Sequence, residues 1–393
     1  MRYQRNELDR FTFQRYKRAG TCNTGVCICE TGCHGVACEF PSKDRHRTSG
    51  RPAIYVYTLP PAFNVYLDAW SNERNTGWWL WRALLNSTHR TFNPHEADFF
   101  FVPVFPMFSV QETVLVRALR YIQQVLPYWN ATCGHNHIAV GAWDFGLAKI
   151  AGLPEFQRII QLSHFGWTNI TRSWQVTADG RCRFKTGAAC ATLAGHLGPM
   201  HGVHRPAIDI VIPDIMEQRF KLDKSIAVTA KRTTRVFFAG GPTNIFREDI
   251  YALHRNVSGW RIINGHVDLA KEVASAVFCL DLSGAGFSTR FTLAMVLGCI
   301  PVYIDELVQP WDSVLPLEQF SIRFTVAELP QLPRIIGSIA DETVAMLQAA
   351  VLKYRSAYHW RTLFGPAGGA VDTSSDPDAF ETLMKTLESR AGK

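Results

Sequence analysis

The sequence predicts an α/β protein with two doubly wound, Rossmann-like domains. One observation is the stretch 277–304, where an apolar strand, a small-residue loop, a helix and a second apolar strand follow one another. Another is 234–241, an apolar strand that ends in two glycines directly before an expected helix at 244–253. The first half alternates in the same way, with apolar strands expected at 53–57, 99–103, 137–140 and 209–213. Because such alternation builds parallel sheets, we expect two of them, facing each other across a cleft.

The composition is that of a packed globular chain. Its 393 residues suffice for two domains and a small additional module, and 47% of them are hydrophobic. The formal net charge of +7 is mild, and ordinary surface charge explains it. We therefore expect no nucleic-acid partner, although the sign also suits an anionic nucleotide or polysaccharide.

The loop of the first stretch has the residue types of an anion-binding site. Gly284 and Gly286 follow the strand, and Ser288 precedes Arg290, which we place on the first turn of the helix. At the carboxyl edge of a parallel sheet, backbone N–H groups, hydroxyls and an arginine fork suit a diphosphate. Arg247 occupies the corresponding place after the second strand and is another candidate cation. The spacing differs from the dinucleotide-binding fingerprint and from the P-loop, and glycines of this kind also serve as simple turn residues.

Together these strings resemble the exostosin family, glycosyltransferase family 47. The family pattern has Phe-Cys-Leu, a glycine-rich loop, Ser-x-Arg-Phe, Cys-Ile-Pro-Val, an acidic turn and a proline–aromatic pair. The matching strings in this chain are Phe278-Cys279-Leu280, Ser288-Thr289-Arg290-Phe291, Cys299-Ile300-Pro301-Val302, Asp305-Glu306 and Pro310-Trp311. The resemblance runs from about residue 51 to about residue 360 and is densest from 234 to 311.

The resemblance implies the GT-B architecture, with a nucleotide sugar such as a UDP-sugar in the C-terminal domain. It implies a polysaccharide or glycoprotein glycan as acceptor, inversion, and no cofactor or metal, because positive side chains stabilise the departing diphosphate. Arg290 and Ser288 with the glycines would hold that diphosphate, and Arg247 would assist. Asp305 or Glu306 would accept hydrogen bonds from ribose or sugar hydroxyls. The chain is one residue shorter than the family pattern here, so the choice between these two acids stays open.

An inverting transfer needs a base that takes the proton of the acceptor hydroxyl. Asp144 and His137, both in the N-terminal half, are the candidates, and a structural role for each is the alternative. The family has an Asp-His dipeptide where this chain has Asn136 before His137. With Cys133 and His135, His137 also forms a possible metal triplet, but a histidine at a strand edge is the commoner explanation.

A second hypothesis is a catalytically inactive, glycan-binding member of the same family, since similarity of fold does not secure activity. Thr58 stands where the family usually has Asp, and Asn136 departs from its Asp-His dipeptide. Stabilisation by a donor separates the hypotheses, because only a working donor site stabilises the fold by mass action.

Five of the ten cysteines crowd between Cys22 and Cys38. Their spacing resembles the C-terminal half of an EGF-like module, in which the last two cysteines pair, here Cys29 with Cys38. Cys33 is additional to that pattern. A zinc knuckle is the alternative, but the Cys and His spacing is irregular and the cysteine usage is that of an oxidising compartment.

The chain has no apolar run of ~18 residues or more, the length needed to span a membrane, and residues 1–18 are too charged for a signal peptide. Yet the cysteines and four Asn-x-Ser/Thr sequons indicate a glycoprotein of the secretory pathway, in the Golgi lumen or membrane. We therefore expect that membrane association depends on a targeting segment absent from this chain.

The expected domain organisation has six parts. They are a stem at 1–20, the EGF-like segment at 21–40, a linker at 41–51, an acceptor-side domain at 52–225, a nucleotide-sugar-binding domain at 226–340 and C-terminal helices at 341–393.

Overall fold

The computed structural model describes most of the chain from residue 52 onward and four short strands before it. The described residues are 20–23, 26–29, 33–34, 40–41, 52–63, 75–106, 109–148, 150–168, 204–216, 231–284, 286–305, 307–364 and 376–391. The early strands form two antiparallel pairs: β1 (Gly20–Asn23) with β2 (Val26–Cys29), and β3 (Cys33–His34) with β4 (Phe40–Pro41). Cys38 lies outside the described residues, so the Cys29–Cys38 disulfide and the EGF-like module stay predictions.

The N-terminal domain is a parallel sheet in the order β10-β9-β8-β7-β5-β6. Its strands are β5 (Ile54–Val56), β6 (Arg90–Thr91), β7 (Phe99–Phe101), β8 (His137–Gly141), β9 (Ile160–Ser163) and β10 (Ile210–Val211). The helices are α1 (Thr76–Asn86), α2 (Ser109–Val125) and α3 (Tyr128–Thr132), preceded by the short η2 (Pro61–Phe63).

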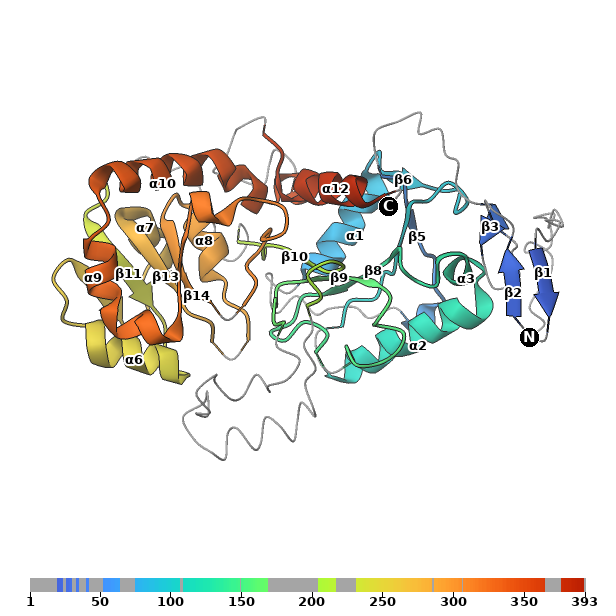
Figure 1. The fold of residues 1–393 in the computed structure, drawn as a ribbon, viewed down its shortest axis with the longest axis horizontal. Coiled ribbons are helices and arrows are strands. Elements are labelled where there is room, and N and C mark those ends of the chain that lie inside the picture. The colour runs from blue at the N-terminus through green and yellow to red at the C-terminus, as the bar shows by residue number, and fades with distance from the viewer. Residues whose placement is uncertain are drawn as a thin grey trace.

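Helices cover both faces of this sheet, with α1 above it and α2 below it in Figure 1. Val56 belongs to the same buried cluster as Leu80 of α1, whereas Phe100 clusters with Leu115 of α2. Since successive side chains of a strand point to opposite faces, continuous apolar runs are what such a sheet requires. Strand β9 was not predicted, because its Gln161 and Ser163 interrupt the apolar pattern although both are buried.

The C-terminal domain is a second parallel sheet, in the order β12-β11-β13-β14-β15. Its strands are β11 (Thr234–Ala239), β12 (Trp260–Ile263), β13 (Ala276–Asp281), β14 (Ile300–Ile304) and β15 (Ile322–Phe324). Its helical segments are α6 (Ile245–His254), α7 (Leu269–Ser275), α8 (Arg290–Val296), η4 (Leu317–Gln319), η5 (Val326–Gln331), α9 (Leu332–Gly337) and α10 (Asp341–Tyr354). Figure 1 shows this sheet between α6 and α10.

Two helices of this domain are shorter than the ranges 287–297 and 341–360, in which helical spacing predicts them. Helix α8 begins at Arg290, three residues later than the apolar pattern predicts, and ends before Gly298, whose φ of 75° is easily reached only by glycine. The helix expected at 341–360 stops at Tyr354 and continues as the tight turn η6 (Arg355–Tyr358). Within the described residues no single helix is long and apolar enough to cross a membrane, although the bent pair Val326–Gly337 and Asp341–Leu363 meets those measures together.

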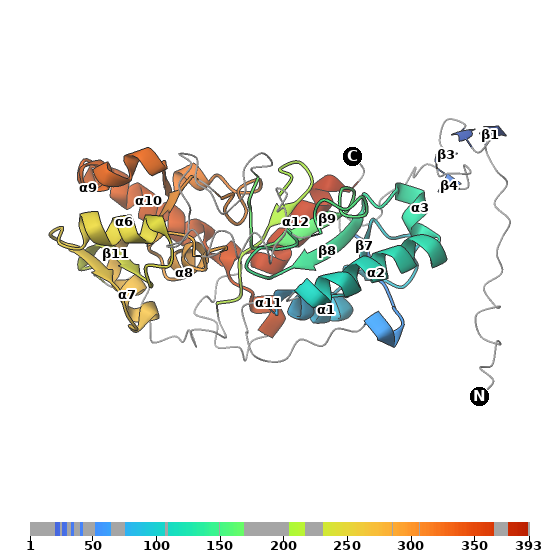
Figure 2. The same cartoon turned by 90° about the horizontal axis from the view of Figure 1, so that it is seen from below.

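After η6 the chain crosses back to the N-terminal domain. The crossing runs through α11 (Arg361–Phe364) to α12 (Ala379–Arg390), which Figures 1 and 2 both place beside the N-terminal sheet. There Arg390 donates to the carbonyl oxygen of Ile208, and the ring of Phe380 contacts that of His89. The indole N–H of Trp360 donates to Pro213 O (3.1 Å). One continuous buried cluster therefore extends over both domains.

The carboxyl edges of the two sheets face each other and are joined by backbone hydrogen bonds. Phe287 N, after β13, donates to Asp144 O, after β8, at 3.0 Å. Val308 N, after β14, donates to Gly166 O, after β9, at 2.9 Å. Because the loops that follow parallel strands gather at this edge, the residues that follow the strands of both domains meet in one place. This is the facing arrangement of two sheets that the sequence predicts.

A buried disulfide links neighbouring strands of the C-terminal domain. Cys279 in β13 pairs with Cys299, the residue before β14, and both are at most 3% exposed. Both cysteines belong to the family strings, but their pairing was not predicted. The closed loop contains α8 and the loop after β13, so the bridge constrains the segment that carries Arg290. Cys133, by contrast, has an exposed free thiol.

We predict that replacing both Cys279 and Cys299 by Ala lowers the free energy of unfolding by about 3 kcal/mol, because a bridge closing a loop of some 20 residues restricts the unfolded chain. Urea denaturation with and without a reductant measures this. Cys133→Ala is the matched control and leaves the midpoint unchanged. A wild-type midpoint that a reductant does not lower, in protein shown to be reduced, contradicts the prediction.

Candidate active site

Two loops at the carboxyl edge of the C-terminal sheet form the centre of the candidate site. One leads from β13 to α8, and the other leads from β11 through 240–244 to α6. Because β11 and β13 are neighbours, the loops lie side by side. The side chain of Asn244 caps α6 by accepting from Arg247 N (3.1 Å) and donates to two carbonyl oxygens of the other loop, at 2.7 and 3.0 Å.

The guanidinium of Arg247 ties the same two loops together. Its Nε and Nη2 donate to Leu282 O (3.2 and 2.9 Å) after β13. Its Nη1 donates to Gly241 O (3.4 Å) and Thr243 Oγ1 (3.3 Å) after β11. Arg247 is only 7% exposed, and burial lowers its pKa while nearby Asp281 raises it. The charge remains, since an arginine stays protonated in proteins.

Arg290 lies beside Arg247 at the same edge. Its Nε and Nη2 donate to Ala239 O, the last residue of β11, at 3.0 and 2.7 Å. The ring of Phe238 lies under both guanidinium groups, 5.1 Å from that of Arg290 and 5.8 Å from that of Arg247. A Cβ at Gly240 would collide with Arg290 and lie 3.4 Å from Arg247 Nη1. The absence of a side chain at Gly240 thus lets the two cations approach.

Asp281 is the acid beneath this pair of cations. It ends β13 and is 3% exposed, and among the described residues its buried Oδ1 has no hydrogen-bond partner. Burial raises the pKa of Asp281 to about 6, although Ser288, Arg290 and Arg247 each lower it. Asp281 was not among the residues predicted for the site. Its signal was available: an acid at the carboxyl end of an apolar strand, directly before the glycine-rich loop.

His164 reaches this place from the N-terminal domain. It follows β9, is 5% exposed, and lines a narrow pocket together with Asp281 and the loop after β13. Its ring lies 5.1 Å from that of Phe287. The Nδ1–H donates to Ile212 O (2.9 Å), which leaves Nε2 to bond with Thr76 Oγ1 (3.0 Å). Sequence reasoning missed His164 because it missed the strand that precedes it.

Asp144, one of the two candidate bases, lies directly against the loop after β13. Its carbonyl oxygen accepts from Phe287 N (3.0 Å), and a Cβ at Gly286 would collide with that carbonyl. The close approach of the two domains therefore requires glycine at position 286, which the sequence analysis had assigned to anion binding. The half-buried Asp144 comes from the domain expected to hold the acceptor.

His137, the other candidate base, is placed elsewhere. It opens β8, at the end of the strand away from the cleft, and is 0% exposed. Its Nε2 bonds with the Tyr57 hydroxyl (2.7 Å), and the rings of Phe100 and Trp129 pack on it at 5.0 and 4.7 Å. Burial lowers the pKa of His137 to about 3. These surroundings favour the structural alternative for His137.

The acidic turn after β14 is only partly described. Asp305 has a 44% exposed side chain and lies 3.5 Å from the Arg323 guanidinium on β15. Its carboxylate therefore lies toward β15, on the side of β14 opposite to β13 and the paired arginines. Glu306 lies outside the described residues, so the choice between these two acids stays a prediction.

Among the described residues, no group of three or more His, Cys, Asp or Glu side chains is placed to hold a metal ion.

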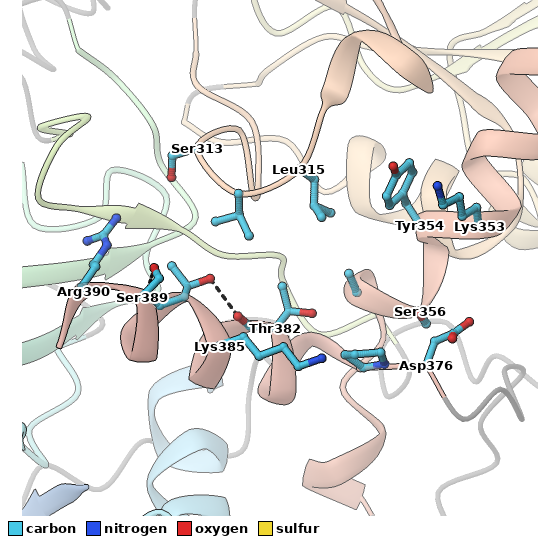
Figure 3. Close-up of a pocket in the computed structure, with 14 residues that line it drawn as sticks. Ser313, Leu315, Lys353, Tyr354, Ser356, Asp376, Thr382, Lys385, Ser389 and Arg390 are labelled. Atoms are coloured by element: carbon cyan, nitrogen blue, oxygen red, sulfur yellow. Dashed lines mark hydrogen bonds between the residues drawn. The ribbon is translucent and has the colours of Figure 1, made fainter. Parts of the chain in front are cut away.

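A cavity of about 560 Å³ lies between α12 and the end of α10, where Tyr354, Thr382 and Arg390 are among its walls (Figure 3). None of its lining residues belongs to the two loops.

Comparison with known proteins gives the class and the family of this chain, which is a glycosyltransferase. The family model of the Exostosin GT47 domain matches residues 48–339, so the chain belongs to that family. A probable glucuronosyltransferase GUT1 of Oryza sativa subsp. japonica is 27% identical over 82% of this chain and 79% of its own length. The probable beta-1,4-xylosyltransferase IRX10 of Arabidopsis thaliana is 26% identical over 76% of this chain and 74% of its own.

A likeness to solved structures is more distant. Anabaena Alr3699/HepE in complex with UDP-glucose is 11% identical, with a TM-score of 0.34 over 80% of this chain and 97% of that one. At this distance the likeness supports no inference about the site. The family membership rests on the sequence match, and the site rests on the contacts described above.

We predict that Asp281→Asn stabilises the fold more at pH 7 than at pH 4.5. The folded-state pKa of about 6 exceeds the ordinary 3.8, so the folded state binds this proton more tightly than the unfolded chain. In the wild type, this tighter proton binding stabilises the folded state fully below about pH 4. The stabilisation is lost as the pH rises through 6, which lowers the free energy of unfolding by up to about 3 kcal/mol. Urea denaturation of both proteins at the two pH values measures it. An equal stability difference at both pH values contradicts the prediction.

Proposed function

We propose that this chain transfers a sugar from a UDP-sugar to a glycan acceptor, with inversion at the anomeric carbon and without a metal ion. The observation that carries the proposal is the pair Arg247 and Arg290, held by two adjacent loops at the carboxyl edge of the C-terminal sheet. Two guanidinium groups over one aromatic ring place two positive charges together, which favours a diphosphate there, although the Nε–Nη2 side of each group already donates to backbone carbonyl oxygens.

In the proposed reaction the arginines act on the leaving group. As the bond from the anomeric carbon to the diphosphate oxygen breaks, its electron pair goes to the diphosphate, which gains negative charge. Cations fixed in place before the reaction stabilise that charge without reorganising. Arg247 is fixed by four donated hydrogen bonds and Arg290 by two. Positive side chains then do the work that a divalent cation does in metal-dependent enzymes.

Asp144 is the proposed base. It lies across the domain interface from the donor loop, on the side from which the acceptor enters. The acceptor oxygen attacks the anomeric carbon opposite the leaving group, and its proton passes to the Asp144 carboxylate. A single displacement of this kind inverts the anomeric centre. Fully buried His137, which burial keeps neutral, has no comparable access to an acceptor.

The names of the relatives suggest which donor sugars to test first. Their printed names include glucuronosyltransferases, a glucuronoxylan glucuronosyltransferase and a beta-1,4-xylosyltransferase. We therefore propose UDP-glucuronate and UDP-xylose as first donors, with a polysaccharide or glycoprotein glycan as acceptor. The proposed location is the Golgi lumen or membrane. Three sequon asparagines in the described residues, Asn86, Asn130 and Asn256, are exposed, which is compatible with that compartment.

We predict that UDP and the true UDP-sugar raise the thermal midpoint of the wild type in the presence of EDTA. Binding at 100 times the dissociation constant stabilises the folded state by about 2.7 kcal/mol. Arg290→Ala abolishes the shift. Arg261→Ala, which removes an arginine of β12 that pairs with Glu272 of α7, retains it. If no nucleotide raises the thermal midpoint of the wild type, the proposed donor site is wrong or inactive, and the result favours the hypothesis of an inactive glycan-binding protein.

We predict that Asp144→Asn lowers the transfer rate by about 10²–10⁴-fold and leaves the UDP-dependent thermal shift intact, because the amide cannot take the proton. Transfer from the shifting donor to a glycan panel is followed by product analysis, and NMR of the new glycosidic bond shows whether the anomeric centre is inverted. A wild-type rate in Asp144→Asn rules out Asp144 as the base, and retention of configuration rules out single displacement.

A further inference from the structure

A pocket of about 260 Å³ opens on the N-terminal domain, between α1 and the ends of β5 and β7. Its walls include the indoles of Trp78 and Trp81, the ring of Phe105 and the guanidinium of Arg90. None of the residues proposed above for the donor or the base lines it. It is small for a whole nucleotide and suits one sugar ring.

The walls arise from a second stripe of large side chains along α1. Leu80 and Leu84, four residues apart, are the stripe that α1 buries in the core, at no more than 1% exposed. Trp78, Trp81 and Leu85 are spaced by three and four residues, so they share a neighbouring face of the helix and line the pocket. Both tryptophans are only half-buried. Burying one face of α1 against the sheet therefore leaves two indoles beside an open hollow.

The chemistry of this hollow matches a sugar ring. A pyranose has an apolar face of C–H groups, which packs on an aromatic ring, and a rim of hydroxyls, which need hydrogen-bond partners. Trp78 and Trp81 offer the rings, with Trp81 6.3 Å from Phe105 between ring centres. Arg90 is held at the rim by its bond to Leu85 O (3.2 Å) and by packing on Phe92, and its guanidinium carries five donors in all.

The pocket lies on the path that an acceptor chain would follow. Helix α1 begins at Thr76, whose hydroxyl bonds with His164, and the ring of His164 contacts Phe287 in the donor loop. Trp78 follows two residues later, and Trp81 lies three residues beyond Trp78, roughly 4.5 Å farther along the helix axis. The indoles thus lead away from the domain interface along the acceptor-side domain.

We propose that this pocket is a subsite for one pyranose unit of the acceptor glycan, positioned away from the unit that receives the new sugar. The inference rests on the proposed function for the identity of its ligand, but glycan binding is measured without any donor. The two proposals can therefore fail separately. A wild type that UDP does not stabilise contradicts the donor site, and a wild type that binds no glycan contradicts this subsite.

The test is isothermal titration calorimetry of the wild type with xylohexaose, cellohexaose and chitohexaose, without nucleotide. We expect at least one hexasaccharide to bind and Trp81→Ala to weaken it at least tenfold, while Trp81→Phe keeps most of the affinity. Trp79→Ala is the matched control, because Trp79 is half-buried on the same helix but does not line the pocket. Circular dichroism and the thermal midpoint without ligand verify that each variant is folded.

In the transfer assay, we expect Trp81→Ala to raise KM for the hexasaccharide acceptor at least tenfold with little change in kcat or in KM for the donor. The proposal is overturned if none of the three hexasaccharides binds the wild type. It is equally overturned if folded Trp81→Ala binds as tightly as Trp79→Ala, or if the loss appears in kcat with an unchanged acceptor KM.

Discussion

The guanidinium of Arg247 is the constraint on which the candidate active site depends. It is almost fully buried, and its N–H groups donate hydrogen bonds to backbone carbonyl oxygens of two separate loops. A buried charge is costly unless it is hydrogen-bonded, so the folded structure keeps Leu282 and Gly241 where their carbonyl oxygens meet it. The two loops are thereby fixed to each other before any ligand arrives, and Arg290 is positioned on the loop that Arg247 holds.

A second consequence is electrostatic. Two guanidinium groups lie over one ring, and the described residue that most directly balances them is Asp281, whose burial raises its pKa to about 6. Near neutral pH this carboxylate neutralises part of the positive charge. A bound diphosphate would bring far more negative charge to the same place. This positive charge supports the proposed diphosphate site, and it comes from side chains fixed by backbone contacts rather than from mobile surface groups.

The fold was largely predictable because apolar runs followed by glycine mark buried parallel strands. Gly284, Ser288, Arg290 and Arg247 do gather at one edge of a sheet, since the positions after neighbouring parallel strands necessarily meet there. The limits have physical causes as well. Packing between the domains decides which loops of the N-terminal domain contact these residues, and a single sequence does not reveal it. For this reason neither His164 nor the interface contact of Gly286 was predicted.

The candidate base illustrates the same limit. Both Asp144 and His137 occur near one short strand, and a family pattern alone treats them alike. The direction of the strand separates them, because His137 opens β8 whereas Asp144 follows its carboxyl end. This distinction was available from the sequence. The burial of His137 among aromatic rings was not, since Tyr57, Phe100 and Trp129 come from three other segments of the chain.

The measurement that tests the account most directly is a crystal structure of the chain with UDP bound. The account predicts phosphate oxygens within hydrogen-bonding distance, about 2.7–3.2 Å, of the Arg290 guanidinium and of the loop that Arg247 holds, with Asp144 facing them across the cleft. UDP bound elsewhere, for example in the cavity between α12 and α10, with the paired arginines unoccupied, would contradict it.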